Sequence, residues 1–253
     1  MGTPLSILDY HQPVEFRIGD VILRTWNILS RHFLTFALLV GIAELLPLVL
    51  TLLFAEGSAI PGNFRVSALA IGAGIGFLQF VLTSFAQAIV VFAAFQDLRG
   101  RPVKAIESLR HGLSRLFPVL VASVLTGLLI AVGAILCLIP GLVALTAMAV
   151  VLPACVVERL GPIESMSRSA DLTTGHRWPI LAVGVAWLVV VMVVTGAIEA
   201  AMPGVATLPV QLLTWTWQVI SATFSSVYAA ILYHDLRAVR EGIGIDEIAS
   251  IFD

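Results

Sequence analysis

The residue best suited to chemistry is an acid inside an apolar segment. Glu44 is the only charged residue between positions 33 and 54. It lies about eleven residues into this segment, roughly 16 Å along a helix, which is near the middle of a bilayer about 30 Å thick. A carboxyl group at that depth usually faces a bundle interior or a water-filled cavity, where it binds a proton, an ion or a substrate. Glu44 is therefore the candidate ionisable centre.

A structural role for Glu44 is the alternative, and the sequence favours it slightly. A protonated carboxyl group can hydrogen-bond glutamines on other helices and hold the helices together, and the chain offers four such partners: Gln79, Gln87, Gln211 and Gln218. Pro47 follows three residues after Glu44. Because proline frees a backbone carbonyl of the preceding turn, Pro47 is a candidate helix break or hinge beside the acid.

The usual catalytic and metal-binding patterns do not occur in the sequence. The five histidines form no His-Glu-x-x-His pair, and no Gly-x-Ser-x-Gly elbow is present. The acids Glu158, Glu164 and Asp171 alternate with arginines, which is typical of a solvated helix with weak ion pairs. We therefore expect a protein that is not an enzyme and holds neither a metal nor a cofactor.

The composition is that of an integral membrane protein. Of 253 residues, 59% are hydrophobic and 12% are charged, and the mean hydropathy is +1.01, unlike a soluble domain. The net charge of −2 gives no basic surplus for binding nucleic acid. We expect membrane lipids as partners, with another membrane protein or further copies of this chain as additional candidates.

The apolar segments predict an all-α protein with six transmembrane helices in three hairpins, forming one membrane domain over residues 1–253. The spans are predicted at 33–54, 70–95, 117–139, 142–157, 179–198 and 208–233. The charge-free stretch 116–157 is too long for one helix, and Ile139-Pro140-Gly141 predicts a turn at its middle. Pro140, Gly141 and Pro153 are the further candidate helix breaks or hinges.

The positive charges predict the orientation. Thirteen of the 14 Lys and Arg residues fall before the first span, in alternate connections or after the last span, and only Arg65 lies on the opposite side. Because Lys and Arg are retained in the cytoplasm, both termini are predicted to be cytoplasmic, including the tail 234–253. No cleaved signal peptide is expected, since the first span is too long for one.

The segment 1–32 contains a predicted amphipathic helix. Ile18, Val21, Ile22, Trp26 and Leu29 recur at helical spacing, with arginines on the opposite face. Such a helix either lies in the membrane interface or packs on protein, and the sequence leaves both open. The candidate contacts to anionic lipid headgroups are arginines of the cytoplasmic segments: Arg17, Arg24, Arg31, Arg110 and Arg168.

A repeat supports this organisation. The sequence IESLR at 106–110 leads to Phe117-Pro118, and IESMSR at 163–168 leads to Trp178-Pro179. We therefore predict three units, each a cytoplasmic amphipathic helix followed by a hairpin of two spans. Convergence of interfacial aromatic residues and helix-starting prolines is the alternative explanation.

The segment 139–181 resembles a bacterial family. The matching residues are Pro140-Gly141, Pro153 ahead of Glu158, Gly161-Pro162, Arg168-Ser169, Leu172-Thr173, Gly175 and Arg177-Trp178. With the segments FRIGDVILRTWNILSRHF and YHDLRAVREGIGID, they resemble the membrane domain of glycerophosphoryl diester phosphodiesterases and YciC-like inner-membrane proteins. The resemblance implies a multi-pass protein of the bacterial inner membrane. The phosphodiesterase activity does not follow, because in those enzymes it belongs to a separate barrel for which this chain has no room.

Two functions follow as expectations. The first is a non-enzymatic scaffold of the inner membrane that contacts anionic lipid. The alternative is a small-solute or ion transporter or channel with Glu44 as its ionisable centre and the proline and glycine breaks as hinges.

Overall fold

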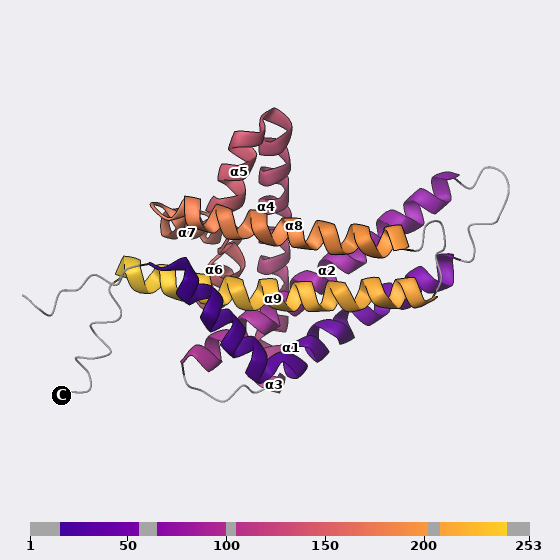
Figure 1. Cartoon of the computed structure of the whole chain (residues 1–253), viewed down its shortest axis with the longest axis horizontal. Helices are drawn as coiled ribbons and strands as arrows, with labels where there is room; N and C mark the ends of the chain where they lie inside the picture. Colours follow the sequence, from indigo (N-terminus) through magenta and orange to yellow (C-terminus); the bar gives the residue numbers. More distant parts are fainter. Residues whose placement is uncertain (1–15, 56–64, 100–104, 202–207, 242–253) are drawn as a thin grey trace, which may run out of the picture.

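The structure is a computed structural model that describes residues 16–55, 65–99, 105–201 and 208–241 (Figure 1). Every regular element in these ranges is an α-helix, which confirms the all-α prediction. The predicted N-terminal segment and tail lie partly outside these ranges, at residues 1–15 and 242–253. The helices are α1 (Ile18–Ala55), α2 (Arg65–Leu98), α3 (Ala105–Ser114), α4 (Leu116–Leu136), α5 (Leu138–Ala147), α6 (Val151–Val157), α7 (Pro162–Thr173), α8 (Arg177–Ala201) and α9 (Leu208–Glu241).

Five stretches in the described ranges are long and apolar enough to cross a membrane. They are Ile18–Leu53, Gly72–Leu98, Leu116–Leu136, Ile139–Val157 and Arg177–Ala201. This confirms a multi-pass membrane protein. The sixth predicted span falls in α9, which has 34 residues but alternates apolar residues with Gln, Thr, Ser and Trp. Six spans in three hairpins are therefore not confirmed.

Helix α1 joins the predicted N-terminal helix to the first predicted span. It runs for 38 residues without a break at position 32, and Figure 1 shows its N-terminal part and the remainder running in different directions. Val21, Ile28 and Leu29 are buried in the core, whereas Trp26 is 65% exposed. The N-terminal part of α1 thus packs on protein with one face and leaves its tryptophan outside.

Of the two predicted proline breaks at Pro47 and Pro153, the first does not interrupt a helix and the second directly follows an interruption at residues 148–150. Pro47 lies inside α1, and the Thr51 hydroxyl donates to the Pro47 carbonyl over 2.8 Å. Pro153 is buried in the first turn of α6, where proline is tolerated because the backbone N–H groups of a first turn have no partner within the helix.

The core joins α1, α2 and α9. Phe36 and Val40 of α1 pack with Val90 of α2 and with Val227 and Ile231 of α9 in one buried apolar cluster. Helix α9 contacts both α1 and α2 along its length. This three-helix core positions the Glu44 side chain among α1, α2 and α9.

The connection between α4 and α5 is tighter than the sequence predicts. The extended residue is Cys137 (φ −169°, ψ 148°), and Pro140 and Gly141 lie in the first turn of α5 instead of forming the turn. A Cβ atom built on Gly141 would lie 2.8 Å from the Cα of Ala134, so only glycine allows the two helix backbones to approach this closely. In Figure 1 the α4–α5 hairpin stands crosswise to α8 and α9.

The exchange Gly141→Ala is expected to destabilise the protein by about 1–3 kcal/mol, because the added methyl group forces two backbones apart. The measurement is the unfolding midpoint of the purified protein in detergent. Gly127→Ala in α4 is the matched control, since its Cβ would meet nothing within 4 Å. Equal midpoints for the two variants would contradict the close approach.

A serine of α7 bridges the break between α5 and α6. Ser169 is fully buried. Its hydroxyl donates to the Ala147 carbonyl over 2.7 Å and accepts from the Val150 N–H over 3.2 Å. Both backbone groups would otherwise be left without a helical partner at the break. The helix break therefore lies at residues 148–150, just before Pro153, and is stabilised by a side chain distant in sequence.

Candidate functional site

The Glu44 carboxyl group lies where α1, α2 and α9 meet. Glu44 is 3% exposed. The Thr83 hydroxyl of α2 donates to Glu44 Oε1, while Oε2 is buried without a hydrogen-bond partner. Water, an ion or a ligand can complete the hydrogen bonding of such an atom, and the indole N–H groups of Trp215 and Trp217 are likewise buried without a partner.

Thr83 suits both protonation states of Glu44. Its oxygen also lies 2.8 Å from the Gln79 carbonyl, one turn earlier in α2. A hydroxyl has one hydrogen and can accept as well. When Glu44 is ionised, Thr83 can donate to the carboxylate; when Glu44 is protonated, Thr83 can accept from it and donate to the Gln79 carbonyl. The contact therefore survives the gain or loss of a proton.

Two cavities adjoin Glu44. Their volumes are about 230 Å³ and 390 Å³, and they share Glu44, Gln79 and Gln218. The first is lined by Glu44, Pro47, Leu48, Thr51, Gln79, Val210, Gln211, Thr214, Trp215 and Gln218. The second is lined by Glu44, Gln79, Thr83, Gln87, Val191, Thr195, Trp217, Gln218, Ser221, Ala222 and Ser225.

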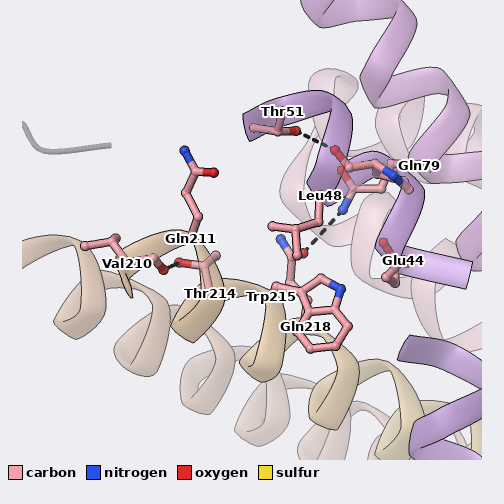
Figure 2. A pocket seen from close by; sticks show the side chains of 10 residues that line it. Glu44, Leu48, Thr51, Gln79, Val210, Gln211, Thr214, Trp215 and Gln218 are labelled. Atoms are coloured by element: carbon pink, nitrogen blue, oxygen red, sulfur yellow. Dashed lines mark hydrogen bonds between the residues drawn. The ribbon is translucent and has the colours of Figure 1, made fainter. Parts of the chain in front are cut away.

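The cavities extend in opposite directions from the shared residues. Along α9 the first reaches back to Val210 and the second forward to Ser225. Figure 2 shows the first cavity, with Glu44 and Gln79 on one side and side chains of α9 on the other. The Gln79 Nε2 donates to Gln218 Oε1 over 3.4 Å. This amide pair and Glu44 thus lie where the two cavities adjoin, among mixed polar and apolar side chains.

The structure brings Glu44 and the four predicted glutamines to the same pair of cavities. Gln79 pairs with Gln218, and the recorded hydrogen bond to the carboxyl group comes from Thr83, which the sequence analysis missed. The sequence does contain a feature that could have pointed to Thr83. It lies four residues after Gln79 and thus on the same helix face.

A second polar cluster connects α6, α7 and α9 at the C-terminal end of α9. The Arg168 Nε donates to both Glu158 oxygens over 3.0 and 3.1 Å, and Arg168 Nη2 donates to Glu241. Arg237 Nε donates to Glu241 Oε2 over 2.6 Å, and the Tyr233 hydroxyl donates to Glu158 Oε1 over 2.5 Å. The sequence predicts weak, solvated ion pairs at Arg168. In the structure Arg168 belongs to this five-residue network.

The network makes folding sensitive to acid. Partial burial raises the pKa of Glu241, but hydrogen bonds from Arg237 and Arg168 outweigh it and hold the pKa below its ordinary value of 4.5. A carboxyl group whose pKa is lower in the folded state stabilises the fold above about pH 4.5 and loses this contribution as the pH falls through the folded-state pKa.

The exchange Glu241→Gln is therefore expected to reduce the loss of stability on acidification. The measurement compares unfolding midpoints of both proteins in detergent from pH 7 down to about pH 3, a range that spans the ordinary carboxyl pKa. The wild type should lose more than the variant. An identical acid dependence would contradict the pairing of Glu241 with the two arginines.

The candidate headgroup arginines differ in their surroundings. Arg17, Arg31 and Arg110 are exposed. Arg24 donates to Asp235 over 2.7 Å, and Arg168 is held between Glu158 and Glu241. Arg24 and Arg168 are therefore engaged by carboxylates of the protein.

A comparison with protein-family models finds no match, and comparisons with curated proteins and with solved structures find none either. The resemblance to the phosphodiesterase membrane domain stays a prediction, and the function has to be argued from the site.

Proposed function

We propose that the protein carries a small polar solute or ion across the membrane through the two cavities at Glu44. One observation carries the proposal: Glu44, a buried acid with one carboxyl oxygen without a partner, is shared by the linings of two adjoining cavities. A carboxyl group that only locked helices together would have its oxygens bonded to neighbouring side chains. Here Gln79 donates to Gln218 over 3.4 Å, and Glu44 Oε2 is buried without a hydrogen-bond partner among the described side chains.

In the proposed membrane arrangement α9 is a further span, and both termini are cytoplasmic in a bacterial inner membrane. A helix of 34 residues is about 51 Å long and can cross a bilayer. Its polar side chains line the cavities, so they do not have to face lipid. The distribution of Lys and Arg supports the orientation.

The lipid-contacting scaffold is the second candidate. It is supported by the N-terminal part of α1, where Trp26 is 65% exposed and Arg31 is exposed as well. An indole and a guanidinium group on a helix are typical of the membrane interface. In this proposal the N-terminal part of α1 is an amphipathic interfacial helix.

Hydration of the cavities tests the transport proposal. Cysteines at Thr214 and Ser221, one in each cavity, are introduced singly into a Cys137→Ser background and treated with a small charged thiol reagent in proteoliposomes. Leu212→Cys is the control, since Leu212 is an exposed apolar residue of the same helix and lines neither cavity. We expect both cavity cysteines to react much faster than the control. Cavity cysteines as inert as the control would mean a dry core and a structural Glu44.

A further inference from the structure

We infer that the solute bound at Glu44 is a small organic cation of the primary-amine class. The inference rests on the proposed function, since it requires that the cavities admit a solute. It follows from the charge, the hydrogen-bonding groups and the aromatic side chains that line the site.

The charge of the site favours a cation. Among the described residues that line the two cavities, Glu44 is the single ionisable side chain, and none is Lys, Arg or His. An ionised carboxyl group buried without a counter-charge is costly. A bound cation supplies that counter-charge, whereas an anion would repel the carboxylate.

The ligand set does not suit a multivalent metal ion. Ca²⁺ and Mg²⁺ prefer six or more oxygen ligands, commonly including more than one carboxylate. The described part of the chain holds no group of three or more His, Cys, Asp or Glu side chains that could bind a metal. A monovalent cation matches the single negative charge of Glu44.

The aromatic side chains distinguish an organic cation from an alkali ion. Trp215 lines the first cavity and Trp217 the second. An indole face attracts an ammonium group and packs against its hydrocarbon part. Volumes of about 230 and 390 Å³ exceed what a dehydrated alkali ion fills and leave room for an alkyl chain.

The oxygen acceptors of the site suit an –NH₃⁺ group, which has three donors and no acceptor, while the buried N–H groups of Trp215 and Trp217 are donors that it does not pair with. Glu44 Oε2 is an acceptor without a partner. Gln79, Gln87 and Gln218 add side-chain carbonyl oxygens to the same walls. Gln218 Oε1 accepts one bond from Gln79 and has a second lone pair available.

The test measures binding of propylammonium to the full chain in detergent by calorimetry, with 1-propanol as the neutral analogue and KCl as the competitor. We expect propylammonium to bind, 1-propanol to bind at least 10-fold more weakly, and KCl to compete poorly. Glu44→Gln should weaken propylammonium binding about 10- to 100-fold, since a charge-assisted hydrogen bond contributes about 1.5–3 kcal/mol. Trp215→Leu should weaken it about 2- to 5-fold through the lost cation–π contact.

Equal binding of 1-propanol, or displacement by KCl at equal concentration, would overturn the amine assignment. So would binding that is unchanged in both variants. If the cavity cysteines react but propylammonium does not bind, the amine inference fails and the transport proposal stands. If the cysteines are inert, the transport proposal itself fails.

Discussion

Proteoliposomes that carry the Glu44→Gln variant are expected to take up propylammonium about 10- to 100-fold more slowly than those that carry the wild type. Glutamine keeps the size of the side chain and can still accept from Thr83, but it removes the negative charge at the junction of the two cavities. The magnitude corresponds to one charge-assisted hydrogen bond of about 1.5–3 kcal/mol.

Uptake is measured with radiolabelled propylammonium after rapid filtration. Leu212→Gln is a control that adds an amide to α9 outside both cavities, and its uptake should match the wild type. Wild-type uptake no faster than that of empty liposomes would refute transport of this cation. Equal uptake by Glu44→Gln and the wild type would show that the carboxyl group is not part of the route.

The exchange Arg168→Ala is expected to lower the free energy of unfolding by about 2–4 kcal/mol. Arg168 donates to Glu158 and Glu241 at once, and its side chain is 26% exposed. Its removal deletes several charge-assisted hydrogen bonds and leaves two carboxylates without their shared cation. The measurement is equilibrium unfolding in detergent micelles.

Two variants separate charge from geometry at this network. Arg168→Lys keeps the charge but lacks the planar fork that reaches two carboxylates, so its loss should be intermediate. Arg240→Ala removes an exposed arginine from the last turn of α9 and should change little. If Arg240→Ala and Arg168→Ala cost the same, the network does not join α7 to α9.

Features that depend on one residue in its own segment could be predicted from the sequence. Glu44 stands out because a charge in an apolar stretch is costly wherever the helix packs. The apolar stretches also predicted the membrane helices, because the length and composition of a segment are enough to recognise such a helix. Helix α9 could not be assigned as a membrane span from composition, because it contains many polar residues. Whether such residues can lie in a membrane depends on their burial against other helices, and composition does not measure that burial.

Features that depend on register between distant segments were missed. Thr83 meets Glu44 across 39 positions, and Arg168 meets Glu241 across 73. Nothing in either local sequence specifies these pairings. The break after α4 was placed at Pro140-Gly141 because both residues disfavour helix interiors, yet both fit a first helical turn. In the structure Cys137 is the extended residue, and Gly141 packs closely on Ala134.

The polar character of α9 has a consequence for biosynthesis. A translocon releases segments into lipid according to their apolarity, and α9 is less apolar than the other long helices. Helices α1 and α2 emerge from the ribosome first, so they can accept the polar face of α9 when it arrives. We therefore expect α9 to integrate as the last helix and only in their presence. A chain that ends before α9 would leave Glu44 facing lipid, a defect that quality-control proteases can recognise.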